Sequence, residues 1–285
     1  MFTCGYVAIA GKPNAGKSTL INALVGEKVA IISNKPQTTR NNIIGIKTTK
    51  DFQIVFVDTP GIHHSKNHLD KYMMKNVRSA LAGVDLIVYL VDGSEATDEE
   101  EIEYINKLKS EDHKVLTVLT KNDQKRKSDL LTDLTISSIT GKNIQTLLDK
   151  IVELLPKYEQ TNYIYDPEMY TDKSLKFLVA ENIREYALKL LNKEIPHGIA
   201  VDITRFDEKD DLTVIEADII CEKDSHKGII IGKGGSMLKK IGEGARKETE
   251  TLLGTKVLLK LFVKVEADWR NKPNKLNLFG YNDKD

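Results

Sequence analysis

The chain has 285 residues, 42 of them Lys or Arg and 42 Asp or Glu, so its formal net charge is zero and bulk charge alone does not indicate a nucleic-acid partner. No run approaches the roughly 20 apolar residues that span a bilayer, and the N-terminus has neither a basic segment nor a cleavage site, so we expect a cytosolic protein. The two cysteines, Cys4 and Cys221, are far apart in sequence, which favours buried, reduced thiols.

Residues 4–155 alternate short apolar runs with stretches of helical periodicity. The apolar runs are CGYVAIA, FQIVFV, DLIVYLVD and KVLTVLT, and the segment NNIIGIKTTK is expected to add an edge strand. Fully apolar strands separated by helices are typical of a parallel sheet that is covered on both faces. Residues 1–157 are therefore predicted to form a doubly wound, mostly parallel α/β domain with ligands at the carboxyl ends of its strands.

A linker is expected at residues 158–172, because Pro156 ends the last helix and the following residues show no sustained period. Beyond it, residues 173–285 predict an amphipathic helix (SLKFLVAENIREYALKLLN) and two alternating strands (IAVDITRF and LTVIEADII). A glycine-rich turn (GIIIGKGGS), a helix (MLKKIGEGARKETETLL) and a last strand (KVLLKLFVKVE) follow. This pattern indicates a second, smaller α+β domain.

The sequence GKPNAGKS at residues 11–18 fits G-x-x-x-x-G-K-[ST] between a predicted strand and a predicted helix, the setting in which this pattern binds phosphates. Its glycines let successive backbone N–H groups face phosphate oxygens at the positive end of the helix. We expect Lys17 to reach the β- and γ-phosphates and Ser18 to offer its hydroxyl to Mg²⁺. The residues expected around the nucleotide here are Gly11, Asn14, Ala15, Gly16, Lys17, Ser18 and Thr19.

The sequence DTPG at residues 58–61 directly follows a predicted strand, so Asp58 should lie at the strand end that faces the phosphate loop. We expect Asp58 to help hold Mg²⁺ and the Gly61 N–H to contact the γ-phosphate. The polar segment SNKPQTTR, residues 33–40, can supply a threonine that closes on Mg²⁺ when a γ-phosphate is present. We assign that role to Thr39, with Thr38 as the alternative. Catalysis would then depend on Lys17, Thr39 and Gly61.

Residue 62 is Ile, where many small GTPases carry a glutamine that orients the attacking water. An isoleucine side chain can neither donate nor accept a hydrogen bond, so we expect slow intrinsic turnover. Asn14 could help hold K⁺ where an arginine finger would otherwise place its charge.

The sequence TKND at residues 120–123 follows a predicted strand and fits the guanine-reading pattern [NT]-K-x-D. The carboxylate of Asp123 can accept from N1–H and from the 2-amino group of guanine, whereas adenine lacks this pair of donors. Thr120 stands where asparagine is more usual. The remaining expected contacts to the base come from Lys121, Ser137 and Ser138.

A glycine loop in the second domain, Gly232 to Gly235, has the form G-x-x-G before a predicted helix. Such a loop brings the backbone close to a nucleic-acid strand and presents a helix N-terminus to its phosphates. Residues 227–275 hold 12 basic and 5 acidic residues, whereas residues 202–224 hold 9 acidic and 3 basic, so the loop lies in a locally cationic region. The residues expected to contact RNA are Ile231, Gly232, Lys233, Gly234, Gly235, Lys239 and Lys240.

Together the segments GKPNAGKS, PQTTR, DTPG, TKND and SSITG, with IPHGIAVDI and GIIIGKGG, resemble the Era family of bacterial GTPases over nearly the whole chain. The resemblance implies a P-loop GTPase domain followed by a type II KH domain, with GTP and GDP as substrate and product and Mg²⁺ as cofactor. It also implies binding to the 3′ region of small-subunit ribosomal RNA, a role in small-subunit assembly and, in some members, loose contact with the inner face of the membrane. We expect RNA and not DNA as the partner, and a monomer.

The main interpretation is a GTPase switch whose output is RNA binding. The alternative is an RNA-binding scaffold in which the nucleotide site is structural. An ATP-dependent enzyme is disfavoured because TKND does not suit adenine.

Overall fold

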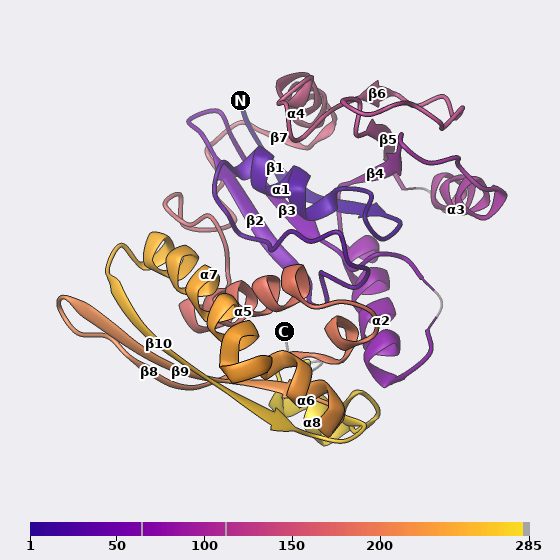
Figure 1. The fold of residues 1–285 in the computed structure, drawn as a ribbon. Coiled ribbons are helices and arrows are strands. Elements are labelled where there is room, and N and C mark those ends of the chain that lie inside the picture. The colour runs from indigo at the N-terminus through magenta and orange to yellow at the C-terminus, as the bar shows by residue number, and fades with distance from the viewer. Residues whose placement is uncertain (64, 112, 282–285) are drawn as a thin grey trace. The chain divides into compact units, whose positions relative to one another are not determined.

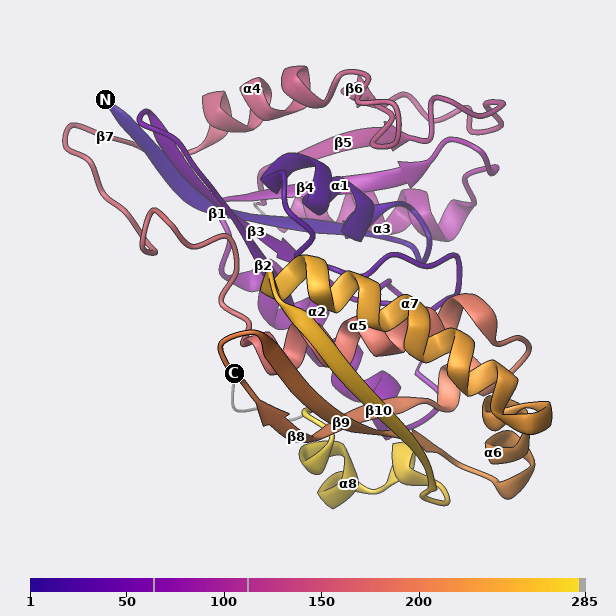
Figure 2. The same cartoon turned by 60° about the vertical axis from the view of Figure 1, so that its left-hand side comes forward.

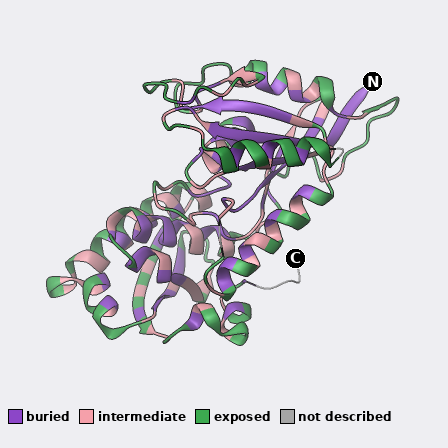
Figure 3. Cartoon of the chain, turned by 90° about the vertical axis from the view of Figure 1, so that its right-hand side faces the viewer, coloured by how far each residue is buried: buried purple, intermediate pink, exposed green. Residues whose placement is uncertain are grey.

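The computed structural model describes residues 1–63, 65–111 and 113–281. Contacts along the chain separate two compact units. The first contains residues 1–30, 39–64 and 73–172, and the second contains residues 31–38, 65–72 and 173–285. Each unit has a buried core of its own, visible as the buried strands and helix faces in Figure 3.

A seven-stranded sheet forms the centre of the first unit (Figure 1). Its order is β2-β3-β1-β4-β5-β6, with β7 paired to β1. All pairs along the main path are parallel except β2 with β3, so the segment predicted as an edge strand is an antiparallel edge. The strands are β1 (Phe2–Gly11), β2 (Ile43–Thr48), β3 (Phe52–Asp58), β4 (Leu86–Asp92), β5 (Val115–Thr120), β6 (Leu134–Thr135) and β7 (Lys157–Tyr158).

Helices cover both faces of this sheet. One core cluster packs β1, β3 and β4 against α1 (Lys17–Val25) and α4 (Ile144–Leu154). The other packs the opposite face against α2 (His68–Ala82) and α3 (Glu99–Ser110). The predicted doubly wound α/β domain is confirmed, because the parallel sheet has helices on both faces. Burial on both faces also explains why its central strands are apolar along most of their length.

The segment predicted as a linker is packed within the first unit. Its β7 pairs antiparallel with the start of β1. The fully buried Gln53 donates from its amide to the carbonyl oxygen of Tyr165 (2.9 Å), and its Oε1 accepts from the N–H groups of Ile164 (2.7 Å) and Tyr165 (2.9 Å). The N–H of Ile46 donates to the carbonyl oxygen of Tyr170. These hydrogen bonds pair backbone groups of residues 164, 165 and 170 with strands of the sheet. Residues 158–172 are therefore packed against the first unit.

The second unit is a three-stranded sheet with helices on one face. The strands β8 (Ala200–Asp207) and β9 (Leu212–Cys221) are antiparallel, and β10 (Lys256–Val265) runs parallel to β9. The covering helices are α5 (Leu175–Leu190), α6 (Asp224–Ile231) and α7 (Ser236–Leu253), and Figure 2 shows α5 beside α7. The short 3₁₀ turns η1 (Ile195–Gly198) and η2 (Lys233–Gly235) precede β8 and α7.

Beyond the predicted last strand the chain adds a 3₁₀ turn, η3 (Trp269–Asn271), and α8 (Pro273–Leu278). Trp269 is fully buried, donates from its indole N–H to the carbonyl oxygen of Gly198 (3.0 Å) and stacks on Tyr281. A single aromatic side chain therefore anchors this end of the chain, which short-range periodicity did not predict.

Candidate nucleotide site and nucleic-acid interface

The phosphate loop joins the end of β1 to the start of α1. Gly11, Asn14 and Gly16 have positive φ angles of 143°, 64° and 95°. A Cβ on Gly11 would lie 2.5 Å from the carbonyl oxygen of Leu90, so glycine is required there. Gly16 is the N-cap of α1 and supplies no side-chain cap, so the first N–H groups of the helix can face an anion. The buried Ala15 and the half-buried Thr19 flank this turn.

Lys17 is buried inside the loop. Its Nζ donates to the carbonyl oxygens of Gly11 (3.1 Å) and Lys12 (2.7 Å). Burial lowers the pKa of Lys17 to about 8, although the nearby charge of Asp58 opposes the shift. Because burial destabilises the charged form of this ammonium group, a polyanion in the loop would stabilise that form strongly. A phosphate-binding lysine requires this behaviour.

Ser18, Thr39 and Asp58 meet at one point within the first unit. The hydroxyls of Ser18 and Thr39 donate to Oδ2 of Asp58 at 2.7 and 3.1 Å and lie 2.9 Å from each other. Asp58 is fully buried, and its Oδ1 has no hydrogen-bond donor among the described residues. Burial raises the pKa of Asp58 to about 6 against the hydrogen bond from Ser18. Two hydroxyls and one carboxylate with a free oxygen fit Mg²⁺, which binds few protein oxygens and completes its shell with phosphate and water.

The two candidate threonines have different surroundings. The hydroxyl of Thr38 donates locally to the carbonyl oxygen of Lys35 at 2.6 Å. Thr39 is buried and its hydroxyl faces Ser18 and Asp58. The geometry thus favours Thr39 over Thr38 as the threonine that closes on Mg²⁺.

Gly61 passes directly against the phosphate loop. A Cβ on Gly61 would lie 2.8 Å from the N and Cα atoms of Pro13, so a larger residue would push the loop aside. The next residue, Ile62, packs against the core cluster beneath α2 and α3. An apolar side chain held in that core cannot orient a water molecule.

Thr120 bridges strand β5 to the phosphate loop. Its hydroxyl donates to the carbonyl oxygen of Ala15 at 2.9 Å and also lies 3.1 Å from that of Val91. A hydroxyl therefore supplies the link to the phosphate loop that an asparagine amide would make.

Asp123 is oriented by Ser137, whose hydroxyl donates to Oδ1 at 2.6 Å. Ser137 is fully buried and Ser138 beside it is half-buried. Lys121 has a positive φ of 55° and its ammonium pairs with Asp92. These residues from two loops form one cluster beyond the ends of β5 and β6.

Two acidic partners of the site were missed by sequence reasoning. Asp92 ends β4; burial would raise its pKa, but hydrogen bonds from Lys121 and Ser94 hold that pKa below its ordinary value. Asp98 caps α3 and pairs with Lys12 of the phosphate loop. Asp92 had a signal, since a polar residue closes the apolar run DLIVYLVD.

The glycine loop of the second unit lies between α6 and α7. Gly232, Gly234 and Gly235 have φ angles of 74°, 59° and 78°. A Cβ on Gly232 would lie 2.7 Å from Cβ of Met237, whereas Gly234 and Gly235 face open space. The half-buried Ile231 precedes the loop, and the side chains of Lys233, Lys239 and Lys240 are exposed around it.

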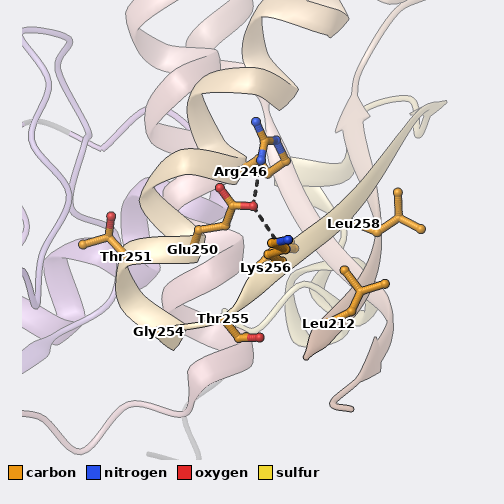
Figure 4. Close-up of a pocket in the computed structure, with 9 residues that line it drawn as sticks. Leu212, Arg246, Glu250, Thr251, Gly254, Thr255, Lys256 and Leu258 are labelled. Atoms are coloured by element: carbon orange, nitrogen blue, oxygen red, sulfur yellow. Dashed lines mark hydrogen bonds and ion pairs between the residues drawn. The ribbon is translucent and has the colours of Figure 1, made fainter. Parts of the chain in front are cut away.

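Two hollows follow α7 away from this loop. The nearer one, about 330 Å³, is lined by Gly235, Leu238, Lys239, Gly242, Glu243, Arg246, Leu259 and Leu261. The farther one, about 880 Å³, is open to solvent and is shown in Figure 4, where Arg246 donates to Glu250 at 2.7 Å. The two hollows share Arg246 and are both lined by residues of α7 and β10, and we call them together the groove along α7. Leucine side chains line this groove, and its charged residues are Lys239, Arg246 and Lys256 with Glu243 and Glu250. Such a groove suits unstacked bases with their phosphates at the rim.

Comparisons with known proteins match both halves of the chain. The profile of the family described as 50S ribosome-binding GTPase matches residues 6–121, and that of the KH domain matches residues 194–270. GTPase Era of Clostridium botulinum (strain Eklund 17B / Type B) is 46% identical over 298 residues and covers 100% of both chains. GTPase Era of Clostridioides difficile (strain 630) is 45% identical over 301 residues, again with full coverage of both. The chain belongs to the Era family of GTPases.

Solved structures of Era agree with this assignment. Era in complex with MgGDPNP and nucleotides 1506–1542 of 16S ribosomal RNA superposes with a TM-score of 0.91 at 38% identity, over 99% of each chain. A variant of Aquifex aeolicus Era bound to GDP·AlF₄⁻ gives the same TM-score and identity over 98% of this chain and 99% of that one. The predicted order of a GTPase domain and a KH domain is therefore confirmed. Among the described helices of this Era-family chain, none is long and apolar enough to cross a membrane.

Proposed function

We propose that this Era-family GTPase is a slow, Mg²⁺-dependent switch that binds the 3′ region of small-subunit ribosomal RNA and acts in assembly of the small ribosomal subunit. The observation that carries the proposal is the meeting of Ser18, Thr39 and Asp58, with one carboxylate oxygen free, beside a loop that suits phosphates. The solved relative in complex with MgGDPNP and 16S ribosomal RNA nucleotides supports both the nucleotide-binding part and the RNA-binding part of this proposal.

In the phosphate site, Lys17 and the amides of residues 11–19 bind the phosphates. Ser18, Thr39 and Asp58 would hold Mg²⁺, and the bound ion would supply positive charge next to the phosphate oxygens. The Gly61 N–H contacts the γ-phosphate. Since Ile62 cannot orient water, positioning and charge are the main contributions left to the protein. Intrinsic turnover should therefore not exceed the rate of unassisted GTPases that carry the glutamine, which is on the order of 10⁻⁴ to 10⁻³ per second.

In the base site, Asp123 accepts from guanine while Ser137 holds the carboxylate in place. Lys121, whose ammonium pairs with Asp92, would lie beside the base, and the backbone at Ser138 would contact the guanine oxygen. Thr120 fixes the distance between this site and the phosphate loop.

Asn14 is the residue we assign to a K⁺ site. It lies in the phosphate loop with a positive φ and is exposed there, so its amide oxygen can reach a cation beside the phosphates. A cation in that place would stabilise the charge that develops on the phosphates during hydrolysis. Hydrolysis measured in K⁺ and in Na⁺ at equal ionic strength tests this role, and equal rates would remove it.

The RNA site consists of the glycine loop and the groove along α7. Lys233, Lys239 and Lys240 contact phosphates, and the loop at residues 231–235 brings the backbone close to the strand. We place the protein in the cytoplasm as a monomer. Contact with the inner face of the membrane remains an expectation from the family resemblance.

The RNA assignment is tested with Lys233→Asp/Gly234→Asp in the full chain and an oligonucleotide of the 16S ribosomal RNA 3′ region. We expect loss of RNA binding with unchanged GTP hydrolysis, because added negative charge repels phosphate. The matched control Leu175→Asp/Lys176→Asp makes the same charge change on the exposed start of α5 and should bind RNA normally. Normal binding by the first variant would refute the site.

The switch and scaffold interpretations are separated by Lys17→Ala. A switch predicts that wild-type RNA affinity differs between GDP and a non-hydrolysable GTP analogue and that Lys17→Ala abolishes the difference. RNA affinity that ignores both the nucleotide and the substitution would favour the scaffold.

A further inference from the structure

Arg184 on α5 is a buried cation with a well-defined carboxylate partner. Its side chain is 1% exposed, and its Nε and Nη2 donate to the two carboxylate oxygens of Glu181, each at 2.6 Å. A two-point contact of this kind fixes the plane of the guanidinium group. The remaining donor directions are therefore fixed as well.

The Nη2 of Arg184 also donates to the main-chain carbonyl oxygen of Thr38. One residue further along α5, Oε1 of the buried Glu185 accepts from the N–H of Ile32 at 3.1 Å. Residues 31–38 belong to the same compact unit as α5. Both ends of this segment are thus attached to one helix by hydrogen bonds to its backbone.

The segment leads straight into the candidate Mg²⁺ ligand. The carbonyl oxygen of Thr38 lies in the same planar peptide group as the N and Cα atoms of Thr39. A donor that fixes this oxygen therefore limits how the Thr39 backbone can rotate. The hydroxyl of Thr39 in turn lies 2.9 Å from Ser18 and 3.1 Å from Asp58.

Residues 31–38 are also hydrogen-bonded to residues 65–72. The side-chain amide of Gln37 donates to Oδ1 of the buried Asp70 at 2.7 Å, and Oδ2 of Asp70 accepts from the Lys66 N–H at 2.8 Å. Residues 65–72, which follow Gly61 and Ile62, belong to this unit too. Arg184 therefore holds a segment that is itself joined to the chain beyond the DTPG motif.

We propose that Arg184 is a positioning residue for GTP hydrolysis: by fixing the Thr38 carbonyl it orients Thr39 toward Mg²⁺ in the GTP-bound state. This inference rests on the proposed function, because it takes Thr39 as a Mg²⁺ ligand. Arg184 touches neither nucleotide nor metal.

The test compares Arg184→Met with Lys176→Met, which removes an exposed charge at the other end of α5. Single-turnover GTP hydrolysis is measured across a Mg²⁺ titration, together with GDP affinity. We expect Arg184→Met to raise the half-saturating Mg²⁺ concentration about tenfold, the effect of losing one hydrogen bond to a charged donor. GDP affinity should stay within about twofold, because this segment closes only on a γ-phosphate. The Lys176→Met control should match wild type in both measurements.

Two further variants keep the inference testable. Arg184→Met leaves the half-buried carboxylate of Glu181 without its arginine partner, so the double variant Arg184→Met/Glu181→Met removes both charges and should fold. It is expected to show the same Mg²⁺ shift, whereas Arg184→Lys should recover part of it. Wild-type Mg²⁺ dependence in the folded double variant would overturn the inference.

Thr39→Ala separates failure of this inference from failure of the proposed function. If Thr39→Ala leaves the Mg²⁺ dependence unchanged, Thr39 is not a ligand and the proposed metal site fails along with the role of Arg184. If Thr39→Ala shifts the dependence and the folded Arg184 variants do not, the metal site stands and only Arg184 loses its role.

Discussion

The hydroxyl of Thr120 donates a 2.9 Å hydrogen bond to the carbonyl oxygen of Ala15, which joins the end of strand β5 to the phosphate loop across 105 positions of sequence. The same hydroxyl is 3.1 Å from the carbonyl oxygen of Val91. One buried hydroxyl therefore lies within hydrogen-bond distance of both the phosphate loop and strand β4. A residue that departs from the usual asparagine still performs the bridging role.

Thr120→Val is expected to weaken GDP binding about tenfold. The substitution keeps the shape of the side chain but leaves buried carbonyl oxygens without a donor, at a cost of about 1–2 kcal/mol. Thr120→Ser keeps the hydroxyl and should stay within about threefold of wild type. Titration calorimetry with GDP measures both, and equal affinities for the two variants would contradict the bridging role.

Asp123→Asn is expected to exchange guanine for xanthine preference. Without the carboxylate, the two guanine donors lose a charged acceptor, and GTP affinity should fall by about two orders of magnitude or more. Ser137→Ala, which removes only the 2.6 Å hydrogen bond to Asp123, should weaken GTP binding by about tenfold without altering base preference. Competition of GTP and XTP for the site gives the answer, and an unchanged preference for GTP in Asp123→Asn would refute the base assignment.

Binding of Mg²⁺·GDP should be strongest between about pH 6 and pH 8. Burial raises the pKa of Asp58 from 3.8 to about 6 and lowers that of Lys17 from 10.5 to about 8. In the nucleotide-free protein, the raised pKa of Asp58 lowers the free energy of unfolding as pH rises from 3.8 through 6. The lowered pKa of Lys17 lowers the free energy of unfolding as pH falls from 10.5 through 8. In the proposed site, nucleotide and metal are expected to favour the charged forms of Lys17 and Asp58, because phosphate attracts the ammonium and Mg²⁺ attracts the carboxylate.

Affinity should therefore fall about tenfold per pH unit below pH 6 and again above pH 8. Asp58→Asn should lose the acidic limb and keep the basic one. Calorimetric titrations with Mg²⁺·GDP from pH 5 to pH 9 test this, and a flat profile for wild type would contradict the assignment of both groups.

Gly244→Ala and Gly242→Ala should change stability in opposite directions. On α7, a Cβ at Gly244 would lie 2.1 Å from the ring of Tyr186, whereas one at Gly242 would only touch Leu261 at 3.4 Å. Overpacking at Gly244 should cost about 1–3 kcal/mol in the free energy of unfolding. Gly242→Ala should add about 0.5–1 kcal/mol through helix propensity. Denaturant unfolding distinguishes them, and equal stabilisation by both would show that α5 and α7 are not tightly packed.

The parts of the fold that the sequence predicts are those with local signals. Apolar runs such as FQIVFV must be buried strands, and the motifs around Lys17, Asp58 and Asp123 occur at strand ends, where ligands bind in such sheets. The second unit follows from alternating strands and the glycine loop. These features need only periodicity and a few side chains of fixed chemistry.

The parts that escape prediction depend on contacts between distant residues. Gln53 turns an expected linker into packed structure by hydrogen bonding 112 positions away, and Trp269 anchors the C-terminal turns. Asp92 closes an apolar run and so had a sequence signal, but its pairing with Lys121 and that of Asp98 with Lys12 appear only in the folded chain. In the sequence, Arg184 looks like any charged residue on the surface of a helix. Its contact is with the carbonyl oxygen of Thr38, 146 positions earlier, which no local pattern predicts.

The central claim is that this chain hydrolyses GTP at a Mg²⁺-dependent, guanine-selective site built around Lys17. Phosphate release should therefore be measured for the full-length chain with GTP and with ATP, each with and without Mg²⁺, alongside Lys17→Ala. The account predicts slow release from GTP only, dependent on Mg²⁺ and absent in Lys17→Ala. Equal release from ATP, or hydrolysis that survives the loss of Lys17, would contradict it.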